Sequence, residues 1–281
     1  MTVEELALRL SASRAGRAVS PDVVRGAAAW ALERHKPKEA EKAAKTRLHQ
    51  LYGSYIVEKE LDQATDIVAA LERGERDAPS AAQALLPLHG STRERLPELQ
   101  HCYDTIWQVC GAPRRVADIA CGFNPLSFFA LGRTEFELAA LDAGQELVTL
   151  LNRFFAAAGQ DGFHAKAGDA LAAPTTGHYS GDAPTTGHYP GGAPTTGHYD
   201  LALIFKFLPL AERLRRGGAR ALLDSLDARH IVVSFPTRTL GGRNVGMEGN
   251  YAQWFHTLGY PGKVLHSFCL SNELFLIVEG R

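Results

Sequence analysis

The chain has 281 residues, of which 45% are hydrophobic and 22% are charged, with a formal net charge of −1. This length and apolar content suit one large or two modest folded domains and exclude a disordered tail protein. No apolar run is long enough for a membrane-spanning helix, and Glu4 and Glu5 stand where a secretory signal would be positive, so we expect a cytoplasmic protein. The 4 cysteines form no CxxC pair and have no histidine at zinc-finger spacing, which predicts reduced thiols and no metal site.

Residues 1–80 have the pattern of an all-helical domain. Ser20, Pro21 and Asp22 supply an N-cap, a first-turn proline and a favourable charge for one helix. A second helix is predicted from about Pro37, within the basic segment RHKPKEAEKAAKTRLHQ. Such a segment gives a neutral protein a candidate RNA-binding face. The stretch ERGERDAPSAAQ, rich in charge with Gly and Pro, predicts the boundary with the next domain.

Residues 81–281 alternate short apolar runs with helical patterns. A capping box at Ser91–Glu94 is predicted to open a helix whose buried stripe runs to Ile106. Strands are predicted in RRVADIA, FELAALD, FHAKAGD, LALIFKF and HIVVSFP, and a closing antiparallel hairpin in KVLHSFCL and ELFLIVE. Helices are predicted from Asn124-Pro125, through LVTLLNRFFAAAG and over about residues 211–226. The alternation predicts an α/β fold with a mostly parallel sheet and helices on both faces.

The segment 173–199 contains three copies of APTTGHY at a fixed ten-residue period. The Pro and Gly of each copy disfavour both helix and central strand. One hypothesis makes His178, His188 and His198 a metal cluster, but no Cys or carboxylate recurs beside each His to complete a coordination sphere. We expect an insertion loop that arose by tandem duplication, because lengthening a surface loop costs little free energy.

Acidic residues end three successive predicted strands: Asp118, Asp142 and Asp169. A carboxylate at the second position is typical of a ribose ligand, and one at the third is placed to accept from an adenine amine. The alternative is that each Asp only caps a helix or turn. Three aspartates at the ends of three successive strands favour a crevice that binds a nucleoside over three separate caps. Because the glycine-rich diphosphate loop and GxxxxGK[ST] are missing, S-adenosylmethionine is favoured over NAD or ATP.

The sequence resembles the aminoglycoside-resistance methyltransferases that modify N7 of guanine 1405 in 16S ribosomal RNA. The segments that carry the resemblance are KTRLHQLYGSYI, HGSTRERLPELQHCYDTIW, DIACGFNPL, LALIFKFLPL and VVSFPTRTLGGRNVGM. The likeness runs from about residue 19 to the end of the sequence and breaks only across the repeats. It implies a Rossmann-like methyltransferase domain with a seven-stranded, mostly parallel sheet, an N-terminal domain that binds ribosomal RNA, and a monomer that acts on the 30S subunit.

The resemblance also implies a set of site residues. Arg95 is expected to bind the methionine carboxylate of the cofactor; an ordinary surface arginine is the alternative. The other expected cofactor residues are Tyr55, His89, Gly90, Ser91, Ala120, Gly122, Asp142, Asp169, Ala170, Phe205 and Leu214. Core packing is an equal alternative for Tyr55 and Phe205.

A second set of residues is expected to contact RNA or the target nucleotide. Its members are Lys42, Lys45, Arg47, Lys206, Arg238, Arg243 and Met247. For Lys206, a lysine at a strand end that only faces water is the alternative. Family members often have Lys where this chain has Val245, so one phosphate contact is expected to be lost or relocated.

The implied reaction explains why no catalytic acid or base stands out. Guanine N7 carries an in-plane lone pair and no proton, so its methylation needs orientation more than proton transfer. Three alternatives stay open at this stage. They are methylation of a nearby adenine of the decoding site, methylation of a small-molecule antibiotic precursor, and a binding protein that keeps the cofactor fold without turnover.

Overall fold

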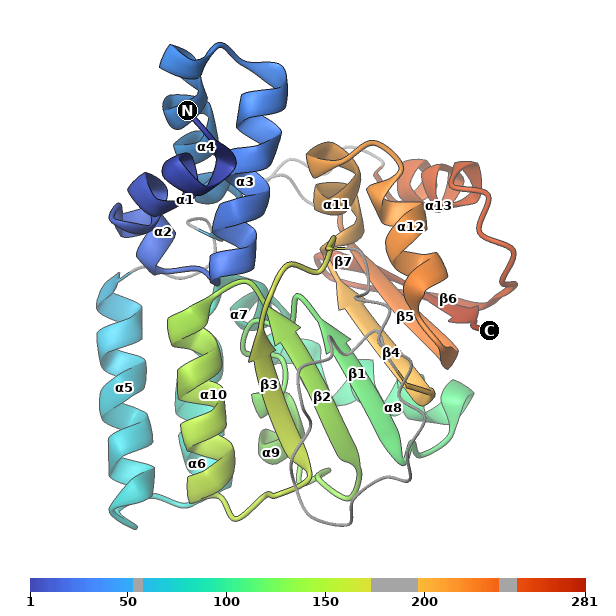
Figure 1. Ribbon diagram of the computed structural model, residues 1–281. Helices are drawn as coiled ribbons and strands as arrows, with labels where there is room; N and C mark the ends of the chain where they lie inside the picture. The colour runs from blue at the N-terminus through green and yellow to red at the C-terminus, as the bar shows by residue number, and fades with distance from the viewer. Residues whose placement is uncertain (53–57, 173–196, 238–246) are drawn as a thin grey trace.

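The computed structural model describes residues 1–52, 58–172, 197–237 and 247–281, and places a group of helices beside a twisted sheet (Figure 1). The first group consists of α1 (Val3–Ser11), α2 (Arg14–Arg17), α3 (Pro21–Arg34) and α4 (Pro37–Tyr52). The predicted cap of α3 is confirmed, since Ser20 accepts from the Val23 amide at 3.5 Å. The apolar faces of α1, α3 and α4 form a small core of their own around Leu6, Leu10 and Leu48.

The described part of the remaining chain forms a seven-stranded sheet in the order β3-β2-β1-β4-β5-β7-β6. The strands are β1 (Arg115–Ile119), β2 (Glu137–Asp142), β3 (Phe163–Ala167), β4 (Tyr199–Phe205), β5 (Ala228–Pro236), β6 (Val264–Leu270) and β7 (Glu273–Glu279). Strands β1 to β5 run parallel, while β7 pairs antiparallel with both β5 and β6. The predicted fold class and closing hairpin are therefore confirmed.

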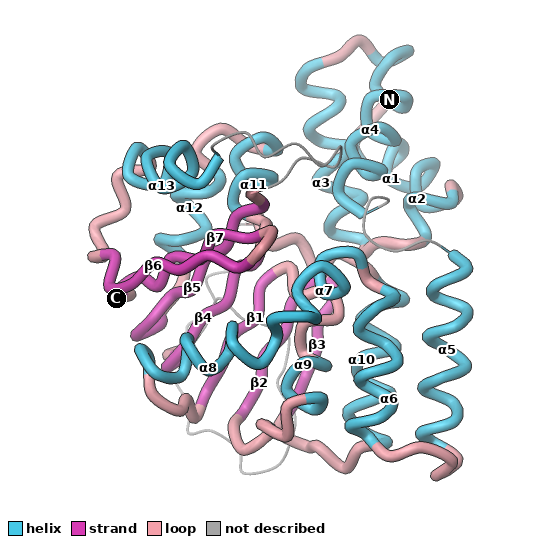
Figure 2. Tube along the Cα trace, turned by 180° about the vertical axis from the view of Figure 1, so that it is seen from behind, coloured by secondary structure: helices cyan, strands magenta, loops and turns pink. Residues whose placement is uncertain are grey.

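Helices cover both faces of the sheet, which is why the central strands are almost continuously apolar. One face shares a core with α5 (Glu58–Glu72), α6 (Ala78–Leu85), α8 (Leu99–Cys110), α9 (Leu126–Ala130) and α10 (Gln145–Ala157). The opposite face packs against α11 (Leu208–Leu214), α12 (Gly218–Ser225) and α13 (Met247–Thr257). Figure 2 shows α8 and α9 lying across the first of these faces. None of the helices that the structure describes is long and apolar enough to cross a membrane.

Two helix predictions are wrong in detail. The capping box at Ser91 does not form, because α7 (Gly90–Arg95) already starts after His89 and the Thr92 hydroxyl donates to the His89 carbonyl. Pro97 then interrupts the helix with a 3-10 turn, Leu96–Glu98, before α8 begins. The helix predicted over 211–226 is two helices, since Gly217 adopts the left-handed region with a φ of 75° between α11 and α12.

The apolar side chains of α5 and α6 belong to the core beneath the sheet and not to the core of α1, α3 and α4. We therefore propose that the domains divide between α4 and α5, earlier than the predicted boundary at residue 80. Most of the repeat segment lies outside the described residues, including His178 and His188. His198 is described, and its Nδ1 lies 2.9 Å from the Asp227 carboxylate. Tyr199, the last residue of the third copy, begins β4.

Candidate functional site

A pocket opens where the carboxyl ends of β1 to β4 meet, the place where open α/β sheets bind ligands. Its empty space of about 890 Å³ includes the solvent at its open mouth. The lining residues are Val23, His89, Ser91, Arg95, Ala120, Cys121, Gly122, Asn124, Asp142, Ala143, Leu147, Gly168, Asp169, Ala170, Phe205, Lys206, Phe207 and Leu210. The structure thus brings nine of the predicted cofactor residues together, with Lys206 beside them.

The loop after β1 forms the floor of this pocket through two left-handed residues. Ala120 has a φ of 55° and Gly122 a φ of 52°, a conformation that costs a non-glycine residue free energy. A Cβ atom on Gly122 would lie 2.5 Å from Cε1 of His89, so a larger residue would force the His89 ring or the loop to shift. The loop is tied to the neighbouring strand by the Cys121 amide, which donates to the Leu141 carbonyl at 3.0 Å.

Asp142 lines the pocket and accepts hydrogen bonds from the loop after β1 and the loop after β2. Its Oδ2 accepts from the Gly122 amide and its Oδ1 from the Gly144 amide, each at 2.9 Å. Burial raises the pKa of Asp142, and these amides partly offset that effect by stabilising the ionised form. Because each carboxylate oxygen has two lone pairs, both keep capacity for a ligand hydroxyl.

Asp169 lies two residues after the end of β3 and has a similar arrangement. Its Oδ1 accepts from the Leu171 amide at 2.8 Å. Burial raises its pKa, against the effects of that amide and of the Arg47 charge. The two acids that line the pocket are therefore half-buried carboxylates held in place by backbone donors.

The third acid does not face the pocket, which corrects the prediction of three ligating carboxylates. Asp118 lies beneath the floor, where it accepts from Nδ2 of Asn124 at 2.8 Å. Burial raises its pKa to about 8. Asn124 in turn accepts from the Tyr103 hydroxyl at 2.9 Å and reaches the pocket wall. Asp118 thus acts on the site through Asn124.

Arg95 is buried in an ion pair and is not the surface arginine of the alternative interpretation; its side chain is 1% exposed. Nε donates to Oε2 of Glu273 at 3.2 Å, Nη2 to Oε1 of the same residue at 2.8 Å, and Nη1 to Asn124 at 3.1 Å. The guanidinium also lies 4.5 Å from the ring centre of Phe205. These bonds use three of its five N–H groups, and Arg95 lines the pocket.

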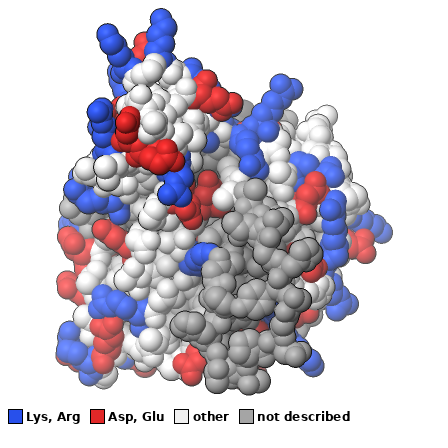
Figure 3. All heavy atoms as spheres, viewed as in Figure 1, with Lys and Arg blue, Asp and Glu red and all other residues white. Residues whose placement is uncertain are grey.

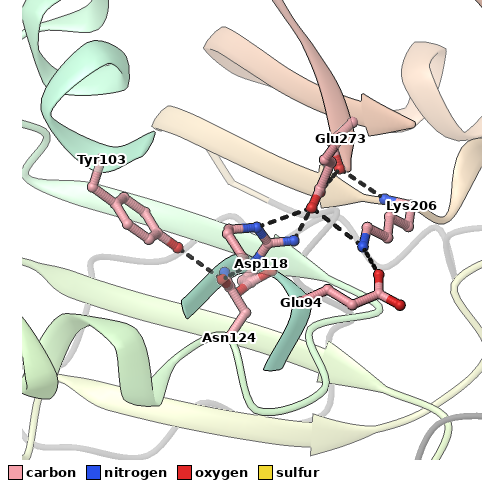
Figure 4. A network of polar contacts seen from close by, with 8 residues as sticks. Glu94, Tyr103, Asp118, Asn124, Lys206 and Glu273 are labelled. Atoms are coloured by element: carbon pink, nitrogen blue, oxygen red, sulfur yellow. Dashed lines mark hydrogen bonds and ion pairs between the residues drawn. The ribbon is translucent and has the colours of Figure 1, made fainter. Parts of the chain in front are cut away.

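Lys206 extends the same network, as Figure 4 shows. Its Nζ lies 2.6 Å from Glu94 and 3.3 Å from Glu273, and its side chain is buried. The water-facing lysine of the alternative interpretation is therefore wrong. Burial, together with the positive charges of Arg95 and Lys206, lowers the pKa of His89 to about 3, so this pocket-lining imidazole is neutral near pH 7.

Sequence reasoning missed Glu273, the acid that pairs with both cations. Its one local signal is a charged residue at the first position of the apolar run ELFLIVE. The side chain of Glu273 is 2% exposed, and the Ser234 hydroxyl also donates to it. Sequence reasoning also missed the pocket residues Val23, Cys121, Asn124, Ala143, Leu147, Gly168, Phe207 and Leu210.

Several predicted residues lie elsewhere. Gly90 begins α7 without lining the pocket, and Leu214 is buried in the core one helical turn beyond Leu210, which does line it. Lys42 is exposed, and exposed Lys45 pairs with Glu41 at 2.7 Å. The predicted residues outside the described parts of the chain are Tyr55, Arg238, Arg243 and Val245. Met247 begins α13, and its side chain also lies outside the described parts.

The donor set fits S-adenosylmethionine. Carboxylates at the ends of β2 and β3 match hydroxyl and amine donors, a buried guanidinium with unused N–H groups matches a carboxylate, and the left-handed floor leaves room for an adenosine. The fold and this pocket define an S-adenosylmethionine-dependent methyltransferase.

Comparison with known proteins shows to which family of methyltransferases the chain belongs. The family model described as ribosomal RNA methyltransferase (FmrO) matches residues 12–175 and 189–277, so the chain belongs to that family. A 16S rRNA (guanine(1405)-N(7))-methyltransferase of Serratia marcescens is 40% identical, over 99% of both chains. The resemblance stated from the sequence is thereby confirmed.

Solved structures of 16S rRNA methyltransferases are similar to this chain over nearly its whole length. The 16S rRNA methylase RmtB superimposes with a TM-score of 0.78 and 34% identity, covering 100% of this chain and 99% of that chain. The 16S rRNA methyltransferase RmtF, solved in complex with S-adenosyl-L-homocysteine, gives a TM-score of 0.79 and 35% identity over 99% of this chain and 98% of that one. A close structural relative therefore binds the demethylated form of the cofactor that the pocket fits.

Proposed function

We propose that the protein transfers a methyl group from S-adenosylmethionine to N7 of guanine 1405 of 16S rRNA in the 30S subunit, and so confers aminoglycoside resistance. The observation that carries this proposal is the 40% identity, over nearly the whole of both chains, to a methyltransferase named for that nucleotide. The enzyme class is fixed by the family and the pocket, whereas the target nucleotide rests on this relative.

When bound, the cofactor supplies an electrophilic methyl group on a sulfonium. The residues of the chain hold and orient the reactants: we assign Asp142 to the ribose hydroxyls, Asp169 to the adenine amine and Arg95 to the methionine carboxylate. The pairing of Arg95 with Glu273 fixes the plane of the guanidinium, which fits this assignment. Since guanine N7 carries no proton, the site needs no base, and orientation supplies most of the barrier reduction.

The helical domain is the proposed contact with the ribosomal RNA backbone. Lys and Arg side chains project at its tip, where α3 and α4 join, with acidic side chains between them and lower on the same domain (Figure 3). Lys42 and Lys45 are exposed on α4. Such contacts give affinity that is independent of sequence and falls with salt. Arg238, Arg243 and Met247, which follow β5, remain proposed contacts with the target nucleotide.

The test uses intact 30S subunits, free 16S rRNA and S-adenosylmethionine labelled on its methyl group. We expect label in the 30S sample, at one guanine that cleavage at N7-methylguanine maps to position 1405. Cells that express the protein should then grow at aminoglycoside concentrations that stop control cells. Label at a neighbouring adenine, or only in a small-molecule product, would replace the proposed target. No transfer to 30S subunits at low and moderate salt would contradict the proposal.

A further inference from the structure

The helical domain forms part of the pocket wall. Val23, on the first turn of α3, is buried and lines the pocket together with Asp169. One turn further along, a Cβ atom on Gly26 would lie 3.4 Å from Oδ2 of Asp169, so the helix backbone passes close to that carboxylate. The acid assigned to the adenine is therefore enclosed by both domains.

Backbone bonds join the same two regions. The segment before α3 makes an antiparallel bridge between Val19 and Gly144, in the loop that follows β2. The Ser20 amide donates to the Ala143 carbonyl at 2.9 Å, and the Gln145 amide donates to the Ala18 carbonyl at 3.0 Å. Because Ala143 itself lines the pocket, a shift of the helical domain would move the loop that directly follows Asp142.

Arg47 makes a separate contact between the two domains. Its guanidinium lies 4.5 Å from the ring centre of Trp30 on α3, and its Nη2 donates to the Leu214 carbonyl at the end of α11 at 2.9 Å. A cation at that position also complements the negative end of the helix. Burial lowers the pKa of Arg47, and the charge of Asp169 raises it. Arg215, next to Leu214, donates to the Leu171 carbonyl at 2.8 Å, just after Asp169.

Arg47 differs in these respects from the other basic residues proposed as RNA contacts on its helix. Lys42 is exposed, and Lys45 makes an exposed pair with Glu41, within the same helix. The side chain of Arg47, by contrast, donates a hydrogen bond to the methyltransferase domain, across 167 positions of sequence.

We propose that Arg47 is a positioning residue for the cofactor pocket: it clamps the helical domain onto α11 and so holds the wall that α3 contributes beside Asp169. This role replaces the RNA contact expected for Arg47 and leaves Lys42 and Lys45 as RNA contacts. Cofactor binding and docking of the helical domain on RNA are then linked, because each depends on the same domain arrangement. The inference rests on the cofactor pocket and not on the identity of the target nucleotide.

The first test measures S-adenosylhomocysteine affinity by calorimetry without ribosomes, for the wild type, Arg47→Ala, Arg47→Lys and Lys42→Ala. We expect Arg47→Ala to weaken binding by about fivefold or more, the lower range of coupling between sites. Arg47→Lys should recover part of the affinity, since it keeps the charge without the planar fork. Lys42→Ala should bind like the wild type. In turnover assays, Arg47→Ala should raise KM for S-adenosylmethionine, and Lys42→Ala should raise KM for 30S subunits.

Wild-type affinity in Arg47→Ala, or a change confined to KM for 30S subunits, would overturn the proposal. If Arg47→Ala fails to fold, hydrogen exchange on the wild-type protein tests whether the helical domain forms part of the cofactor site. S-adenosylhomocysteine should slow exchange of the Ser20 and Gln145 amides at the joint and of the α3 backbone. Protection limited to the loops after β1, β2 and β3, with α3 unchanged, would show that the helical domain is no part of the site.

Discussion

Nη2 of Arg95 lies 2.8 Å from Oε1 of Glu273, in a buried ion pair between residues 178 positions apart. The pair joins the end of α7 to the start of β7, the strand that lies between β5 and β6 in the sheet. It holds a cationic group at the pocket wall that would otherwise be costly to bury, because an unpaired buried charge loses its hydration without compensation.

Removing the charge of Glu273 should therefore destabilise the protein. Glu273→Gln keeps the shape but leaves Arg95 and Lys206 with too little negative charge, so we expect the free energy of unfolding to fall by about 3 kcal/mol, as for other broken buried pairs. Urea denaturation measures this change. The matched control is Glu75→Gln, which breaks an exposed pair with Arg73 at 2.7 Å and should leave the denaturation midpoint unchanged. Equal midpoints for the two variants would contradict the role given to Glu273.

Gly122→Ala should abolish cofactor binding. The new methyl group would both strain a backbone with positive φ and lie 2.5 Å from the His89 ring. Gly132→Ala separates these effects, since Gly132 has a φ of 64° but a Cβ atom at that position would have no described neighbour within 4 Å. We expect both variants to lose about 1 kcal/mol of stability from backbone strain, with Gly122→Ala losing more. Only Gly122→Ala should fail to bind S-adenosylhomocysteine in calorimetry. Normal binding by Gly122→Ala would show that the loop after β1 can adapt to the extra methyl group.

Asp142→Asn tests the proposed ribose ligand. An amide cannot accept on both sides as the carboxylate does, and it turns an NH2 group toward either a backbone amide or the ligand. We expect the dissociation constant for S-adenosylhomocysteine to rise by roughly tenfold to a hundredfold, the range for losing a hydrogen bond to a charged group. Asp161→Asn, at an exposed position after α10, is the control and should bind normally. Unchanged affinity in Asp142→Asn would remove Asp142 from the cofactor site.

Asp118 should make the protein less stable as pH rises. Its pKa is about 8 in the folded protein, mainly because of burial, and about 3.9 in an unfolded chain. Between these values the folded state holds a proton that the unfolded state has released, so the stabilisation is complete below about pH 3.9 and is lost as pH approaches 8. Asp118→Asn, which can still accept from Asn124, should show a smaller fall in stability between pH 5 and 8, a range chosen around these pKa values. Parallel pH profiles in urea denaturation would show that Asp118 does not titrate in this range.

Deletion of residues 173–192 should leave methylation intact. The segment contains two of the three repeats, and the match to the family model is interrupted between residues 175 and 189. A shorter connection to β4 changes the closure entropy only slightly. Transfer of labelled methyl to 30S subunits measures activity, with S-adenosylhomocysteine affinity as the control for folding. Lost transfer with normal cofactor affinity would instead give the repeats a part in docking on the subunit.

The sequence allowed the order of strands and helices to be predicted because burial on both faces leaves long apolar runs, and the acids at the ends of β2 and β3 followed from the strand ends alone. The capping role predicted for Ser91 was wrong, because α7 starts after His89 and the Thr92 hydroxyl donates to the His89 carbonyl. Leu214 was expected in the pocket from the family resemblance, whereas α11 starts at Leu208 and it is Leu210 that lines the pocket.

Contacts between distant segments could not be predicted from local patterns. Nothing near Glu273 in the sequence indicates Arg95 as its partner, and Val23 has the pattern of an ordinary buried residue of a helix. Arg47 was grouped with Lys42 and Lys45 because all three are basic residues of one helix. Only the hydrogen bond from its side chain to the end of α11 separates Arg47 from the others.

The place of Glu273 in the chain order bears on how the enzyme matures during synthesis. A ribosome releases a protein from its first residue onward, so Arg95, the floor loop and Lys206 all emerge before β7 does. A nascent chain that stops short of Glu273 lacks the carboxylate that pairs with both Arg95 and Lys206 in the folded protein. The network that holds both cations is thus completed only after β7 has been synthesised, although every other part of the pocket described above precedes that strand in the chain.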